Sequence, residues 1–107
     1  MTPTEFVECC AKERESLLAE YTNPKSESLV ARGIVSLNLD DEQKIAMRRI
    51  VEDMLTDVFY TFLLALDGAT SLGGEQVSYK LYDEEGNELT SDLEGLAWER
   101  FYGNALR

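Results

Sequence analysis

The sequence predicts a mostly helical α+β fold with a long central helix from about Asp40 to Leu66, a β-hairpin at about 77–90 and a C-terminal helix. Three observations favour this fold. Apolar residues recur every three or four positions in the long helix, they alternate with polar residues in the hairpin, and capping residues precede the helices. A chain of 107 residues has the commonest domain size, so we expect a single domain over residues 1–107 with one hydrophobic core.

The first predicted helix begins after Thr2 and runs to about Glu20. Thr2 suits the N-cap position, Pro3 is favoured at the first helical position, and Glu5 complements the positive end of the helix dipole. The segment 21–24 ends in proline, which disfavours helical geometry in the preceding residue and therefore stops this helix.

The stretch between the first helix and the long helix carries mixed signals. Residues 24–32 suit a short helix that is capped by Asn23 and closed by Gly33. Residues 35–39 alternate between apolar and polar side chains, which is typical of a strand. We expect a short helix followed by an extended piece.

The long helix has the clearest signals in the chain. Asp40 and Gln43 form a predicted capping box, and two acidic residues follow in the first turn. The apolar positions keep the spacing of an amphipathic helix and are Met47, Ile50, Val51, Met54, Leu55, Val58, Phe59, Phe62, Leu63 and Leu66.

The second half of this helix, residues 58–66, is apolar everywhere except at Thr61, which is typical of an element buried on all sides. A helix over residues 40–66 would span about 40 Å, whereas a compact domain of this size is roughly 35 Å across. Four outcomes follow. The helix is central and wrapped by other elements, it breaks near 56–59, its Val58–Leu66 region forms a homodimer interface, or that region is a buried strand.

The expected β-hairpin follows a glycine-containing loop. Val77, Tyr79 and Leu81 alternate with polar residues, and residues 83–86 suit a type I turn that ends in glycine. The return strand is expected at 87–90. Because an isolated hairpin is only marginally stable, its apolar face should pack on the helices.

The last predicted helix begins at a second capping box, formed by Ser91 and Glu94, and continues to about Tyr102. Its inner stripe consists of Leu93, Leu96, Ala97 and Phe101.

The net charge of −11 is the largest deviation in composition. Residues 67–107 carry nine acidic and three basic side chains, so this part is the denser negative surface. An acidic surface repels nucleic acid and anionic lipid but attracts a basic protein. We therefore expect a basic protein partner, no nucleic acid and no membrane contact, although solubility alone also accounts for an acidic balance. The sequence shows neither a signal-peptide pattern nor a long apolar run, which predicts a cytoplasmic protein.

The residue types argue against an enzyme. The chain contains no histidine, the usual general base, zinc ligand and triad partner. Cys9 and Cys10 are adjacent, and neighbouring side chains on a helix diverge too far for an unstrained disulfide. Asp53 and Asp57 lie one turn apart but lack the histidine partners of a bundle two-metal site. We expect no catalytic residue, no metal site and no cofactor.

The most plausible binding surface lies in the acidic C-terminal part. Aromatic anchors within a charged rim are typical of protein-binding hot spots. The alternative for Trp98 is a place in the core, because tryptophan is largely buried on average. The candidate partner-binding residues are Tyr82, Glu84, Glu85, Glu88, Glu94, Trp98, Glu99 and Tyr102.

Three sequence segments carry a resemblance to known proteins. They are Phe-Leu-Leu-Ala-Leu-Asp-Gly at 62–68, Tyr-Lys-Leu-Tyr-Asp-Glu-Glu-Gly-Asn-Glu-Leu at 79–89 and Trp-Glu-Arg-Phe-Tyr at 98–102. Over residues 40–102 the chain looks like small uncharacterised acidic bacterial proteins, some of which are toxin-immunity proteins. The resemblance implies a protein that binds and inhibits another protein, and it implies no role for a particular residue.

Three functions are therefore open. The first is a non-enzymatic protein-binding module of immunity-like type that meets a basic partner. The second is a homodimeric structural or regulatory protein that uses the Val58–Leu66 region. The third is a small-ligand-binding protein with a pocket between the long helix and the hairpin, near Asp53, Asp57 or Tyr60.

Overall fold

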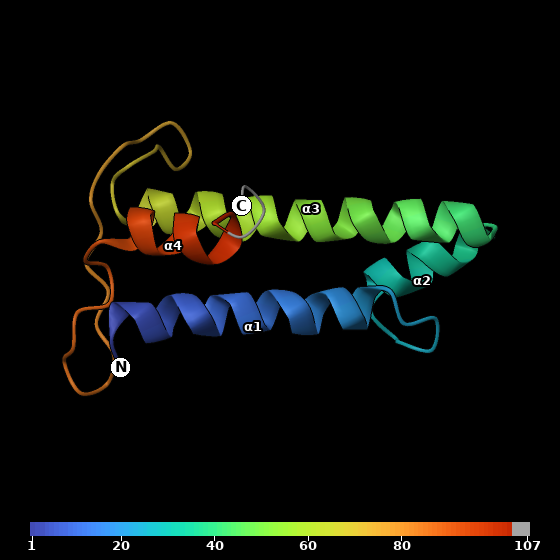
Figure 1. The fold of residues 1–107 in the computed structure, drawn as a ribbon, viewed down its shortest axis with the longest axis horizontal. Coiled ribbons are helices and arrows are strands. Elements are labelled where there is room, and N and C mark those ends of the chain that lie inside the picture. The colour runs from blue at the N-terminus through green and yellow to red at the C-terminus, as the bar shows by residue number, and fades with distance from the viewer. Residues whose placement is uncertain (104–107) are drawn as a thin grey trace.

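The structure, a computed structural model, describes residues 1–103. In this part of the chain four helices form and no strand does, so the predicted α+β class is wrong and the fold is mainly helical (Figure 1). The helices are α1 (Pro3–Tyr21), α2 (Leu29–Ser36), α3 (Asp41–Leu66) and α4 (Leu93–Phe101).

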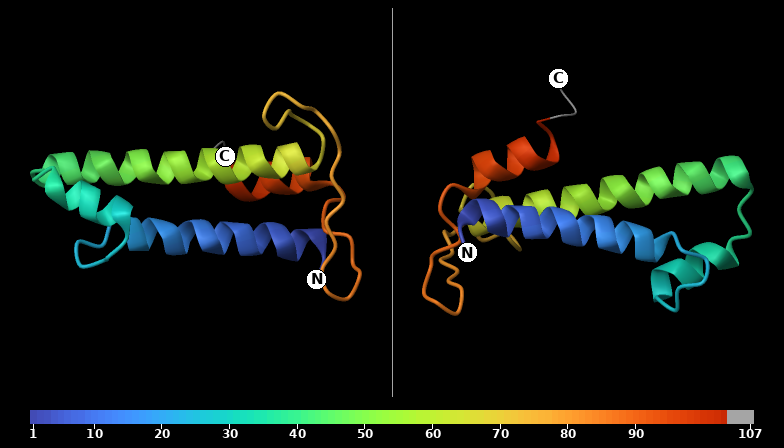
Figure 2. Two further views of the ribbon diagram at one scale, coloured as in Figure 1. Left: turned by 180° about the vertical axis from the view of Figure 1, so that it is seen from behind. Right: turned by 60° about the horizontal axis from the view of Figure 1, so that its bottom comes forward.

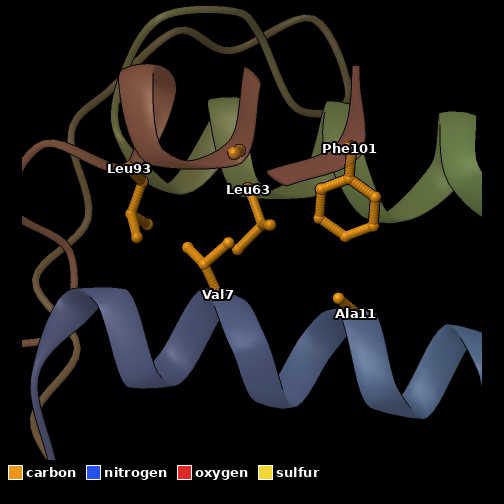
Figure 3. Packing of buried hydrophobic residues seen from close by; sticks show 6 residues of the cluster. Val7, Ala11, Leu63, Leu93 and Phe101 are labelled. Carbon is orange, nitrogen blue, oxygen red and sulfur yellow. The ribbon is translucent and has the colours of Figure 1, made fainter. Parts of the chain in front are cut away.

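The two long helices, α1 and α3, lie side by side and run in opposite directions (Figures 1 and 2). α4 packs against both of them near the N-terminal end of α1, and α2 lies at the other end of the molecule. Buried side chains from α1, α3 and α4 meet in one cluster (Figure 3). Its members are Val7, Ala11, Leu63, Leu93, Ala97 and Phe101.

The capping signals place the starts of both long helices correctly. The Thr2 hydroxyl accepts a bond from the backbone N–H of Glu5, and the Glu5 carboxylate accepts one from the N–H of Thr2. Asp40 and Gln43 form the same reciprocal pair at the start of α3. Each box satisfies backbone donors that a helix start leaves without partners.

The long helix neither breaks near 56–59 nor turns into a strand. The molecule accommodates its length by being elongated, with extents of 46 × 33 × 28 Å. The segment 58–66 is also not buried all round: Leu63 is in the core, whereas Val58 and Phe62 are exposed. A two-helix layer covers only part of the surface of each helix, and this explains the difference.

The predicted hairpin at 77–90 is wrong. The only ladder-like pairing near it is an isolated bridge between Tyr82 and Glu88. The expected turn does form within it, because the N–H of Gly86 donates to the carbonyl of Asp83 at 3.0 Å and Gly86 has a φ of 83°. The segment therefore makes a turn without making a sheet.

Competing hydrogen bonds explain why the ladder stops there. The N–H of Tyr79 donates to the carbonyl of Leu66 at the end of α3, and the N–H of Leu81 donates to the hydroxyl of Thr90. Tyr79, Leu81 and Val77 are also exposed, so their alternating pattern buries no face. A two-stranded hairpin without a covered face is only marginally stable.

The connection between α1 and α3 also differs from prediction. The helix spans Leu29–Ser36 instead of 24–32, and its N-cap is Ser28, whose hydroxyl accepts the N–H of Ala31. Gly33 lies inside this helix and does not end it, and the expected extended piece at 35–39 is absent. The serine cap, which lies closer to the apolar run, determines where the helix begins.

The last helix forms with the predicted inner stripe, but its predicted cap is wrong. The N-cap residue is Asp92, which has a φ of 58° and makes no side-chain cap. Instead, the carboxylate of Asp67, at the end of α3, accepts the N–H of Glu94 at 3.0 Å. A carboxylate there satisfies a free donor and complements the dipole of α4.

Candidate functional site

Three aromatic rings form a cluster where α3 and α4 meet. Tyr60 of α3 lies edge-on to Tyr102, the C-cap residue of α4, with ring centroids 4.9 Å apart and an interplanar angle of 89°. The centroid of Trp98 is 6.2 Å from that of Tyr60 and 5.4 Å from that of Tyr102. These three residues are referred to below as the aromatic cluster.

Helical spacing brings these side chains together. Trp98 and Tyr102 are one turn apart on α4, so they lie on the same face of that helix. On α3, Tyr60 follows Asp53 and Asp57 at the spacing i, i+4, i+7, so these three share a face. A shallow hollow beside the cluster is lined by Asp53, Met54, Thr56, Asp57 and Tyr102.

The surroundings of the cluster are partly buried and acidic. Burial raises the pKa of Tyr60, and the negative field of Glu94 adds to this effect. Burial also raises the pKa of Tyr102, and Asp57 and Asp53 add to it. Both phenols therefore stay neutral hydrogen-bond donors at physiological pH. The carboxylates beside them attract positively charged groups.

The geometry of the cluster limits what it can bind. Its rings are close enough to contact one another, so no gap between them is left for a cation to be enclosed. Trp98 is 43% exposed, so the alternative that places it in the core is wrong. Its free surface can take an apolar side chain or a cation stacked on the indole.

The predicted binding residues fall into separate places. Glu94, Trp98 and Tyr102 share one side of α4 at one-turn intervals. Glu99 lines a different hollow, between α4 and α1, together with Glu8 and other residues. The remaining four lie on the segment near the N-terminus, away from the aromatic cluster (Figure 1). These are Tyr82, Glu84, Glu85 and Glu88.

An ion pair holds the 81–90 segment at the N-terminus of the chain. The Met1 amine donates to a carboxylate oxygen of Asp83 at 2.9 Å. The other Asp83 oxygen accepts the N–H groups of Glu85 and Asn87, which fixes the turn. These bonds, that of the amine foremost, hold the pKa of Asp83 far below its ordinary range. The carboxylate there has a structural role in the turn.

The structure also places the two cysteines and the potential metal ligands. Both cysteines are free; Cys9 is exposed, and burial raises the pKa of the Cys10 thiol. Within residues 1–103 no group of three or more potential ligands is placed to hold a metal ion. In the same part of the chain, no helix has the length and apolar character needed to span a membrane.

Comparisons with known proteins add no relative. No protein-family model, no curated protein and no solved structure matches the chain. The binding surface therefore has to be argued from the residues themselves.

From the sequence, Tyr60 was named only with Asp53 and Asp57, near the pocket of the third hypothesis, and its contact with Trp98 and Tyr102 was not predicted. A signal for it was present. Tyr60 continues the face that Asp53 and Asp57 define, and a ring on a charged face is typical of a surface position.

Proposed function

We propose that the chain is a non-enzymatic protein-binding module whose aromatic cluster receives a basic segment of a partner protein. The observation that carries this proposal is the packing of Tyr60, Trp98 and Tyr102 into one ordered group with an exposed indole beside carboxylates. An immunity-like inhibitor, the role implied by the resemblance above, would be one module of this kind.

Two physical properties support the cluster as an anchor site. Its rings restrain one another, so little side-chain freedom remains to be lost when a partner covers Trp98. The nearby carboxylates of Asp53, Asp57 and Glu94 attract lysine or arginine side chains, and the indole face adds a cation–π contact. Aromatic anchors of this type dominate binding energy at protein interfaces.

A displayed library of random peptides tests the proposal with a defined probe. We expect the wild-type protein to enrich peptides rich in lysine and arginine. Trp98 is the only tryptophan, so its fluorescence reports binding of a synthesised peptide without a label. The substitution Trp98→Ala, followed with a peptide-borne label, should weaken binding at least about 30-fold, because a hot-spot truncation costs 2 kcal/mol or more.

Tyr82→Ala is the matched control, because Tyr82 is an exposed aromatic residue in the same acidic part of the chain. It should change affinity less than about twofold. Higher salt should weaken binding by the wild type, since the attraction is partly electrostatic. Enriched peptides without basic residues, or peptides that bind equally well after Trp98→Ala, would refute the proposal.

A further inference from the structure

An unpartnered apolar stripe runs along α3. Ile50, Met54, Val58 and Phe62 follow one another at intervals of four residues, so they share one side of the helix. Each of these side chains is between 50% and 60% exposed, although both α1 and α4 pack on α3. These four residues are called the α3 stripe below.

The size of the molecular surface shows how much of this chain is left uncovered. Its accessible surface is 7387 Å², whereas a folded monomer of 12.1 kDa typically exposes about 6,000 Å². The radius of gyration is 16.1 Å, against about 13 Å for a compact domain of this length. A single copy thus exposes about 1,400 Å² more than a compact monomer would.

That excess is of the size an interface requires. A standard protein–protein interface removes about 800 Å² from each partner, and obligate homodimers remove more. We propose that two copies of this chain associate through their α3 stripes, so that each copy covers the exposed apolar side chains of the other. A two-helix layer has no second layer to cover its outer face, and a second copy supplies one.

A second copy fits the stripe better than the basic partner does. All four stripe residues are uncharged, so the stripe offers no charge for a basic segment to recognise and no direct repulsion to its own copy. A symmetric dimer needs only one self-complementary surface per chain. This places the interface on Ile50 to Phe62 and moves it towards the N-terminus from the Val58–Leu66 region expected from sequence, where Leu63 and Ala65 are already buried.

The C-terminal half of the α3 stripe, Val58 and Phe62, lies away from the aromatic cluster. Tyr60 is two residues from both Val58 and Phe62, which places it about 200° around the helix from each. Tyr60 therefore lies on the side of α3 opposite Val58 and Phe62, whereas Ile50 is about 80° from it and Met54 lines the hollow beside Tyr102. A dimer would present two copies of the cluster, and the two proposals stand or fall separately.

Sedimentation equilibrium of the full chain, from low to high micromolar concentration, tests the dimer. The wild type should approach twice its 12.1 kDa mass. Met54→Glu and Val58→Glu should each raise the dimer dissociation constant about 1,000-fold. Loss of one hot-spot contact raises the dissociation constant about 30-fold, and a symmetric interface contains each substitution twice.

Ile45→Glu is the matched control on the same helix. Ile45 is 72% exposed, and it lies five residues from Ile50, about 140° around α3 from the start of the stripe. This variant should remain dimeric. A double substitution of Met54 and Val58 by alanine removes apolar area while keeping a good helix former, and far-UV circular dichroism confirms that each variant is folded.

Salt separates the dimer from binding of a basic partner. Each copy has a net charge of −11, so screening should strengthen the dimer, whereas it should weaken binding of basic peptides. A wild-type chain that remains at 12.1 kDa at every concentration and salt level would overturn the proposal. A dimer that survives both glutamate substitutions and the double alanine substitution would overturn it too, because another surface would then hold the copies together.

Discussion

The end of the molecule that contains α4 and the end that contains α2 use the same two long helices, but they are packed differently. At the α4 end, buried residues of three helices form the continuous cluster around Leu63 (Figure 3). At the α2 end, a pocket of about 450 Å³ lies between α2, the end of α1 and the start of α3. Ile34, Val35, Leu39 and Met47 are among its lining residues.

The difference is explained by the spacing of apolar residues on the short helix at each end, α4 or α2. α4 buries Leu93, Ala97 and Phe101, which are four residues apart and lie on one face. α2 buries only Ala31, and its first residue, Leu29, is 83% exposed. A short helix closes a two-helix layer only where its stripe of large side chains faces that layer.

The largest expected effect comes from shortening one leucine at each end. Leu63→Ala should lower the free energy of unfolding by about 2–5 kcal/mol, because Leu63 is fully buried and its loss leaves a cavity. Leu39→Ala, the same substitution beside a pocket that already exists, should cost less than about 1 kcal/mol. Urea unfolding measures both. Equal losses would show that the α2 end is packed as well as the α4 end.

Substitution of two glycines by alanine should change the stability of the protein in opposite directions. Gly68 ends α3 with a φ of 77°, and an added Cβ would collide with the Ser78 hydroxyl, so Gly68→Ala should cost at least roughly 1–2 kcal/mol. Gly33 lies inside α2 with open space around it, so Gly33→Ala should raise stability by about 0.5–1 kcal/mol. Thermal unfolding measures both signs. A destabilising Gly33→Ala would mean that α2 packs more closely than described.

The sequence was a reliable guide to the two long helices because their signals are local. The N-cap and proline signals at Thr2 and Pro3 located the start of α1, and the capping box at Asp40 with a helical period of apolar residues located α3. The segment 77–90 was mistaken for a hairpin because alternation reports which side chains share a side, not whether anything covers that side. The cap of α4 was missed because Asp67 is distant in sequence from Glu94.

The sequence predicted the part of the candidate surface that lies along α4, because that part depends on a local signal. Glu94, Trp98 and Tyr102 are related by helical spacing, which a sequence displays. Their contact with Tyr60 depends on how α4 packs on α3, and their separation from Tyr82 depends on the path of the 81–90 segment. Both depend on tertiary structure, which a periodic pattern does not encode.

The smallest expected effect concerns the ion pair that ties the 81–90 segment to the α4 end. The bond from the Met1 amine lowers the pKa of Asp83, and the bond to Asp83 raises the pKa of that amine. The contribution of Asp83 to stability is present above its unfolded-state pKa and is lost as pH falls through its lowered folded value. The amine contributes below its unfolded-state pKa and loses this contribution as pH rises through its raised folded value. The ion pair should therefore be intact around neutral pH. It should open at strongly acidic pH, where Asp83 is protonated, and at alkaline pH, where the amine loses its proton.

NMR titration of the Met1 amine resonance tests this tie directly. In Asp83→Asn the amine should titrate at lower pH than in the wild type, because its main partner is no longer charged. Glu84→Gln removes a neighbouring carboxylate that makes no contact with the amine, so it should leave the titration unchanged. The unfolding midpoint should move little in either variant, since the pair lies at the molecular surface and surface ion pairs stabilise weakly. An unchanged amine titration in Asp83→Asn would show that the 81–90 segment is not tied to α1, and the α4 end would then be held by its apolar core alone.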